Sequence, residues 1–194
     1  MQGILPFGLA VLGLLSVPGP TNTLMAAAGA SRGVARSLPL IAGELGGYFI
    51  AITFWTELVG AAAVSQPLIG VAAKLIAAGF LLWAAGKLWT HRHGTSDAAP
   101  AISLGRVFAT TLINPKGLVF AFAIFPAVGF IDRLPYLGIL AVLVIVTAIG
   151  WQTLGAAAAL SSRGLLTASR VERASAIALA VFAVLLVVGT MGWH

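Results

Sequence analysis

The sequence predicts an all-α integral membrane protein with six transmembrane helices, arranged as two inverted three-helix repeats whose first and fourth helices are broken. Of its 194 residues 60% are hydrophobic and only 8% are charged, with a mean hydropathy of +1.05. A soluble domain carries about 25% charged residues, so this chain cannot cover an apolar core with a polar surface. Polar residues, prolines and glycines also interrupt the first and fourth apolar segments at corresponding places.

Six apolar segments can be drawn, each close to the roughly 20 residues that cross a bilayer. The longest polar stretch, 91–106, predicts a cytoplasmic linker between a first three-helix repeat at 1–90 and a second at 107–194, within a single membrane domain. The predicted spans are 4–28, 38–61, 68–89, 107–130, 135–160 and 174–192.

Basic residues gather in alternate loops between these segments. Arg32 and Arg36 follow the first segment, the linker is basic, and three arginines follow the fifth segment. Basic loops face the cytoplasm, so both termini are expected to lie outside. The net charge of +6 is therefore explained by basic residues in the loops that face the cytoplasm, and we expect no nucleic-acid partner.

The two halves show traces of an internal repeat. Leu38-Pro39 matches Leu134-Pro135, and Trp55 matches Trp151, at one and the same offset along the chain. Coincidence is the alternative interpretation. A duplication of three spans must be inverted across the membrane, because three is an odd number. The interruptions in the first and fourth segments would then face each other near the midplane.

The interruptions indicate a binding site. Prolines and glycines in the run 16–23 and in the run 112–117 remove or weaken backbone hydrogen bonds of a helix. In hydrocarbon, such breaks are tolerated only against protein or a wet cavity. Paired breaks in two halves are typical of a transporter's binding site. The candidate substrate-binding residues are Ser16, Pro18, Gly19, Pro20, Asn22, Thr23, Asn114, Pro115 and Lys116.

Two charged residues are expected deep in the membrane. Glu44 lies eight residues beyond Arg36, about 12 Å along a helix, and is the candidate proton-coupling residue. Lys116 lies ten residues beyond Arg106, about 15 Å along a helix. Its partner would be Glu44, a carbonyl freed by Pro115 or a ligand carboxylate. The alternatives are a protonated structural acid at Glu44 and a purely structural pairing of Lys116.

Four groups of short motifs follow one another along the chain: Pro18-Gly19-Pro20 with Asn22-Thr23-Leu24, Gly43-Glu44, Lys74-Leu75 with Phe80-Leu81-Leu82-Trp83, and Asn114-Pro115-Lys116 with Phe125-Pro126. In these motifs, their order and their spacing, the chain resembles the LysE/RhtB family of amino-acid exporters. Three departures stand out: Thr21 is inserted between Pro20 and Asn22, Glu44 replaces the usual aspartate, and the fifth span has only Gln152 and Thr153 in place of an acid.

The resemblance implies a LysE family translocator in a bacterial inner membrane, a homodimer that exports an amino acid or a related small metabolite by coupling to protons. We expect no enzyme activity and no cofactor, because no phosphate loop, His-Glu-x-x-His motif or nucleophile elbow is present. We expect no metal site, because His91 and His93 have no third ligand nearby. Two alternatives stay open: a metal-ion or small-ion exporter or channel, and a non-transporting membrane subunit.

Overall fold

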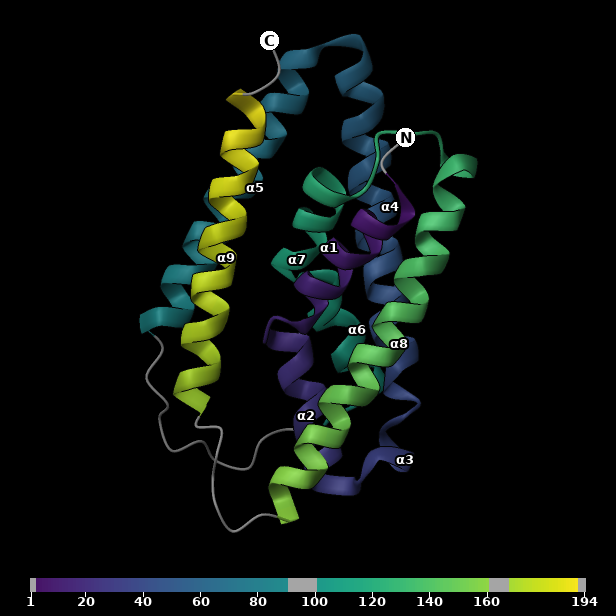
Figure 1. Cartoon of the computed structure of the whole chain (residues 1–194), viewed down its shortest axis with the longest axis vertical. Coiled ribbons are helices and arrows are strands. Elements are labelled where there is room, and N and C mark those ends of the chain that lie inside the picture. Colours follow the sequence, from purple (N-terminus) through teal and green to yellow (C-terminus); the bar gives the residue numbers. More distant parts are fainter. Residues whose placement is uncertain (1–2, 91–100, 161–167, 192–194) are drawn as a thin grey trace.

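The computed structural model describes residues 3–90, 101–160 and 168–191, and within these ranges every regular element is a helix. The histidines of the predicted linker, His91 and His93, lie outside the described residues. In chain order the elements are α1 (Ile4–Ser16), α2 (Pro20–Arg32), α3 (Val34–Ser37), α4 (Leu40–Ser65), α5 (Pro67–Thr90), α6 (Leu104–Leu112), α7 (Pro115–Val119), the π-helix η1 (Phe120–Ile124), α8 (Phe130–Leu160) and α9 (Ala168–Met191) (Figure 1).

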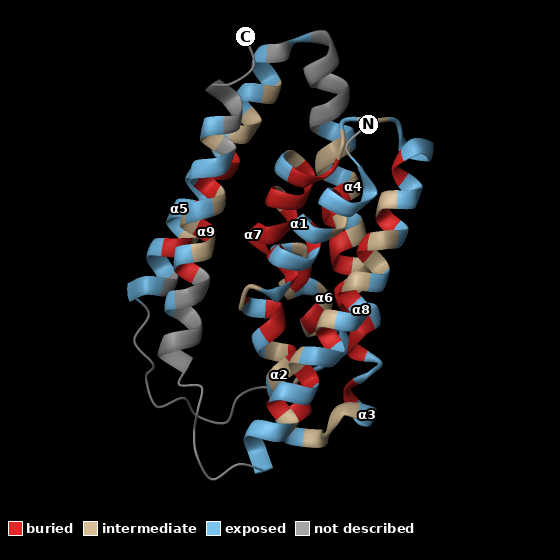
Figure 2. Cartoon of the chain, in the orientation of Figure 1, coloured by how far each residue is buried: buried red, intermediate tan, exposed pale blue. Residues whose placement is uncertain are grey.

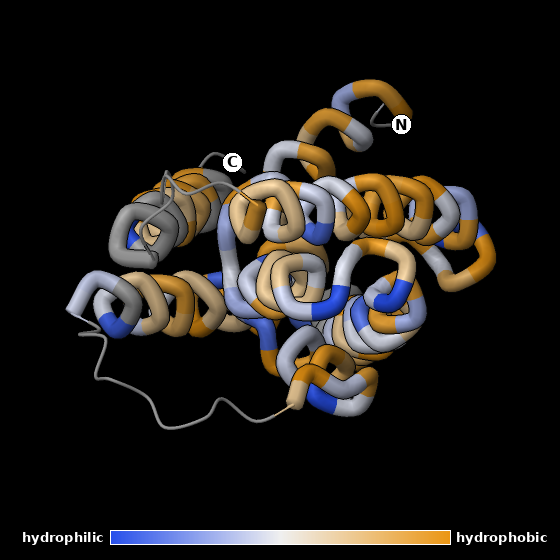
Figure 3. The backbone as a smooth tube through the Cα atoms, turned by 90° about the horizontal axis from the view of Figure 1, so that it is seen from below, coloured by the Kyte–Doolittle hydropathy of each residue, from blue (hydrophilic) through white to orange (hydrophobic). Residues whose placement is uncertain are grey.

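Several of these helices have the length and composition of membrane spans. Among the described residues, three segments qualify singly (Val34–Leu58, Leu68–Lys87 and Phe130–Leu160), and the number reaches five if each bent helix pair is one span. Within α9 the apolar helix Ala176–Leu185 is shorter. The chain is therefore a helical protein with several helices suited to a membrane, as the composition predicts. Figure 3 shows how few strongly hydrophilic residues interrupt the helices.

Both predicted helix breaks are present. α1 and α2 meet at an angle of 63°, and α6 meets the α7–η1 helix at 47°. At the first break Val17 and Gly19 have extended backbones, and Pro20 opens α2. At the second break Asn114 is extended and Pro115 opens α7. Proline suits the first turn of a helix because the amide that it lacks has no intrahelical partner there.

The end of the fourth predicted span is wrong by several residues. The sequence predicts a span to residue 130, whereas η1 ends at Ile124 and Phe125 is extended. Pro126 follows directly, and a residue before proline is pushed toward extended conformations. The predicted start at residue 107 is also too late, since α6 begins at Leu104, where Ser103 accepts a hydrogen bond from the Arg106 amide at 3.2 Å.

The helices pack as two groups. α5 and α9 run alongside each other at one side of the molecule, while α2 packs against α8 and α4 packs against α6 (Figure 1). The start of α1 and the end of α9 lie at the same end of the molecule. Buried residues concentrate on α1, α2, α4, α7 and η1, in the larger group (Figure 2). The broken helices are therefore enclosed by other helices.

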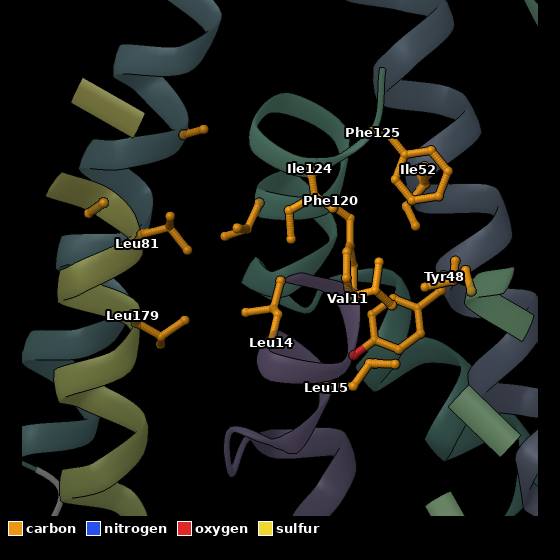
Figure 4. Close-up of a cluster of buried hydrophobic side chains, with 14 of the residues drawn as sticks. Val11, Leu14, Leu15, Tyr48, Ile52, Leu81, Phe120, Ile124, Phe125 and Leu179 are labelled. Carbon is orange, nitrogen blue, oxygen red and sulfur yellow. The ribbon is translucent and has the colours of Figure 1, made fainter. Parts of the chain in front are cut away.

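The outer faces are as apolar as the core. Large hydrophobic side chains such as Leu5, Leu68 and Ile76 are exposed, and they occur on nearly every long helix. An exposed apolar surface of this extent suits contact with hydrocarbon rather than water. The inner cluster contains Val11 and Leu14 of α1, Tyr48 of α4 and Phe120 of η1, as Figure 4 shows.

Glycines let two pairs of helices approach at backbone distance. A Cβ built on Gly29 would lie 1.9 Å from the carbonyl oxygen of Gln152, and one on Gly155 would lie 1.9 Å from that of Ala26. α2 and α8 are therefore in direct backbone contact. A Cβ on Gly43 of α4 would lie 2.7 Å from the Leu104 carbonyl oxygen of α6. Such small-residue contacts are a common way for membrane helices to associate.

Substituting Gly155 with alanine is expected to lower the stability of the folded protein by about 1–3 kcal/mol, because α8 must move away from α2. Gly150→Ala is the matched control on the same helix, since a Cβ there would meet nothing within 4 Å. It should be neutral or slightly stabilising, because glycine costs about 0.5–1 kcal/mol inside a helix. Thermal unfolding in detergent, followed by circular dichroism, measures both. Equal melting temperatures for the two variants would contradict the close contact.

Candidate functional site

The two helix breaks are joined by a buried hydrogen-bond network. Asn114 caps α7, with its Oδ1 accepting from the Lys116 amide at 3.0 Å. The Nδ2 of Asn114 donates to the hydroxyl of Thr21 at 3.0 Å, and this hydroxyl is 3.1 Å from that of Thr111. All four of these side chains are buried. The second break is therefore tied to the first turn of α2.

The end of α1 leaves carbonyl groups that other side chains satisfy. The Nδ2 of Asn22 donates to the carbonyl oxygens of Leu15 at 2.7 Å and Val17 at 2.8 Å. The ammonium group of Lys116 also donates to the Val17 carbonyl. A break in an apolar environment needs such partners, because an unpaired backbone group costs several kcal/mol in hydrocarbon. The sequence allowed Glu44, a carbonyl freed by Pro115 or a ligand carboxylate as the partner of Lys116. The structure shows a backbone carbonyl, but it belongs to Val17 at the first break and not to the second break.

Lys116 lies directly against the start of α2. It is 1% exposed, and a Cβ on Gly19 would be 3.1 Å from its Cε and 3.3 Å from its Nζ. α2 begins here with no side-chain cap. A helix start carries partial positive charge, so this helix end and the lysine place two positive features together. The arrangement is suited to a negatively charged group.

Glu44 and Tyr48 provide unpaired polar atoms on α4. They are four residues apart and therefore lie on the same helix face. Their side chains are 1% and 0% exposed, and the described residues offer no hydrogen-bond partner to Glu44 Oε2 or to the Tyr48 hydroxyl. Glu44 interacts electrostatically with both Tyr48 and Lys116 without a direct ion pair between the carboxylate and the ammonium group. Figure 4 shows Tyr48 reaching from α4 toward the last turn of α1, where Leu14 and Leu15 lie.

The candidate residues from the sequence do not all gather at this point. Gly19, Asn22, Asn114, Pro115 and Lys116 are buried around the joined breaks. Two others serve their own helices, and both are exposed: the Ser16 hydroxyl donates to the Leu12 carbonyl at 2.7 Å, and the Thr23 hydroxyl to the Gly19 carbonyl at 2.9 Å. Pro18 is half-buried and Pro20 is exposed.

The candidate list omitted three residues that the structure places in or beside the network. Thr21, which is an insertion relative to the resembled family, links the two breaks together with the Lys116–Val17 bond. Thr111 lies in the last turn of α6, on the other side of the break from the α7 cap Asn114. Tyr48 lies one turn beyond Glu44. The signal for Tyr48 was its helical spacing from Glu44, because positions three and four apart share a face. No such signal pointed to Thr111, because the helix is broken between it and Asn114.

Gln152, the polar residue of the fifth span, lies elsewhere. It is fully buried, and its Nε2 donates to the Ser37 carbonyl at 3.0 Å and approaches Met25 Sδ at 3.4 Å. It therefore ties α8 to α2 and to the end of α3. Its Oε1 has no hydrogen-bond partner among the described residues. Thr153, by contrast, is exposed and bonds to the Ile149 carbonyl of its own helix.

An ion pair connects α4 to the start of α8. The buried guanidinium of Arg133 donates to the Glu57 carboxylate and, at 2.6 Å, to the Val128 carbonyl. The Glu57 side chain is 52% exposed, against 4% for Arg133. The Glu57 carboxylate is thus paired with Arg133, while about half of its side-chain surface stays exposed. This contact is separate from the joined breaks.

An apolar groove borders the second break on the side of α5. It has a volume of about 540 Å³ and lies between α4, α5 and the α6–α7 break. No lining residue is charged, and Asn114 is the point at which the groove reaches the hydrogen-bond network.

Among the described residues no group of three or more histidine, aspartate or glutamate side chains is placed to hold a metal ion.

Comparisons of the chain with models of protein families, with curated proteins and with solved structures found no match.

Proposed function

We propose that this protein is a secondary-active exporter of an amino acid or a related small metabolite, driven by the proton gradient across a bacterial inner membrane. One observation carries the proposal: two broken helices meet around a buried lysine, which interacts electrostatically with a buried glutamate. Buried charges inside a membrane protein are costly and mark transport pathways or proton relays. The motifs shared with the LysE/RhtB family support the same function.

In this proposal the substrate carboxylate binds where α2 begins. Lys116 supplies a cation, the uncapped start of α2 supplies backbone amides, and Asn114 fixes the second break. In the structure, the Lys116 ammonium group donates to the Val17 carbonyl. Lys116 would then exchange this neutral carbonyl for the anionic carboxylate, so that both partners of the hydrogen bond carry a charge.

Glu44 is the proton carrier in this proposal. Its carboxyl group is buried on α4 near Lys116, and one of its oxygens has no partner among the described residues. It would take up a proton from the outside, release it to the cytoplasm, and so drive the substrate outward. The ionised Glu44 carboxylate and a bound substrate anion would compete for the positive charge of Lys116. Protonation of Glu44 would therefore favour substrate binding, which couples the two events.

The chain is proposed to cross the membrane six times as two inverted repeats, with α9 as the sixth span and the basic loops in the cytoplasm. Both termini then lie outside. This agrees with Figure 1, in which the start of α1 and the end of α9 lie at the same end of the molecule. Alternating access would come from rocking of one three-helix half against the other. A homodimer is the proposed assembly.

The test is counterflow in proteoliposomes with an imposed pH gradient and a panel of labelled amino acids. We expect saturable uptake of at least one class of amino acid, competition by the unlabelled compound, and loss of net accumulation when a protonophore collapses the gradient. Empty liposomes are the control. Saturable flux of a metal ion without amino-acid flux would identify an ion exporter instead. No flux of any kind from folded protein would favour a non-transporting subunit.

A further inference from the structure

The groove beside the second helix break has the size and the chemistry of a small-molecule pocket. Its volume of about 540 Å³ lies within the range of roughly 300–1,000 Å³ that such pockets occupy. Small side chains of α5, Ala72, Ala73 and Ala77, form one wall and leave the space open. Trp55 of α4 and Phe122 of η1 supply aromatic surface.

The groove is continuous with the polar site through one side chain. Asn114 lines the groove, and the same amide group bonds to Thr21 and to the backbone of Lys116. The neighbouring Ile113 also lines the groove and is 76% exposed, so the space opens sideways from the break. Lys116 lies two residues beyond Asn114, so a molecule with its charged end near Lys116 has apolar space on the other side of Asn114.

We propose that this groove holds the side chain of the transported molecule, and that this side chain is bulky and apolar. The inference rests on the proposed export function and names its substrate class. A basic or acidic side chain would have no counter-charge there, because no lining residue is charged, and burying an unpaired charge is strongly unfavourable. A small side chain would leave most of the apolar wall uncovered.

The contact of the groove with the second helix break, through Asn114, favours a substrate side chain as its occupant. A lipid chain or a second copy of the protein would cover only the outer part of the groove, whereas a substrate held at the joined breaks would also fill its inner end at Asn114. A substrate uses both parts, since few polar groups placed in a mainly apolar pocket fix the orientation of a ligand.

The first test measures selectivity in proteoliposomes with leucine, phenylalanine, alanine and lysine. Wild-type protein should transport leucine or phenylalanine with a KM about tenfold or more below that for alanine or lysine, since added apolar contact is worth 10-fold or more. Ala73→Phe fills the groove and should raise the KM for phenylalanine about tenfold while changing that for alanine less than about twofold. Ala157→Phe, at an exposed position of α8, is the matched control and should change neither.

A second measurement reads binding without transport. Trp55 lines the groove, so phenylalanine or leucine should change the tryptophan fluorescence of the detergent-solubilised protein, and Trp55→Phe should remove that change. Ala73→Phe should weaken the response about tenfold relative to wild type.

The outcomes separate this inference from the proposed function. If small or charged amino acids are transported best and Ala73→Phe leaves the preference unchanged, the exporter stands and the groove assignment is overturned. If Ala73→Phe changes only the amount of lipid or of dimer that is purified, the groove belongs to lipid or to a second copy, and the assignment is again overturned. If no amino acid is transported or alters the fluorescence, the export function itself fails.

Discussion

Glu44→Gln is expected to abolish accumulation of substrate driven by a pH gradient while leaving exchange of labelled for unlabelled substrate. Glutamine keeps the shape of the buried side chain but cannot take up or release a proton. Glu44 is 1% exposed and interacts electrostatically with Lys116, so its protonation would change the electrostatic potential at the proposed binding site. Exchange needs binding and reorientation only, and both remain possible with a neutral side chain.

The measurement is gradient-driven uptake beside counterflow, in the same proteoliposome preparation. Glu57→Gln is the matched control, because it removes an acid from the same helix at the pair with Arg133, away from the breaks. This control should keep both activities. Normal gradient-driven transport by the Glu44→Gln protein would show that Glu44 is a structural acid, the alternative that the sequence left open.

Lys116→Met is expected to weaken substrate binding by about 10- to 100-fold, corresponding to the roughly 1.5–3 kcal/mol of a hydrogen bond to a charged group. Methionine is unbranched and fills most of the same space against Gly19, so the packing around the breaks is largely retained. What is lost is the cation at the start of α2 and the bond to the Val17 carbonyl.

The apparent KM in counterflow, together with the melting temperature, tests this expectation. Lys74→Met removes a positive charge from α5, where the side chain is only half-buried, and should leave the KM unchanged. If Lys116→Met lowers the melting temperature but not the affinity, then Lys116 serves only the Val17 carbonyl and the carboxylate site must lie elsewhere.

Some features of the fold follow from single residues and their neighbours in the chain. A chain with 8% charged residues must place its helices in an apolar environment. Pro18 and Pro20 break the first helix, and Pro115, with its Asn114 cap, sets the second break. Each of these effects acts within about four residues, because it depends on one missing amide or one cap. The number of spans and the inverted repeat remain predictions.

Tertiary structure decided which side chains meet. Ser16 was a candidate binding residue and Thr21 was not, yet the Ser16 hydroxyl bonds to its own helix and the Thr21 hydroxyl bonds to Asn114. The groove, the Arg133–Glu57 pair and the orientation of Tyr48 likewise depend on how the helices are rotated and packed. In soluble proteins an apolar stripe shows which helix face is inward. Here outer and inner faces are both apolar, so the rotation of each helix is set only by its contacts with the others.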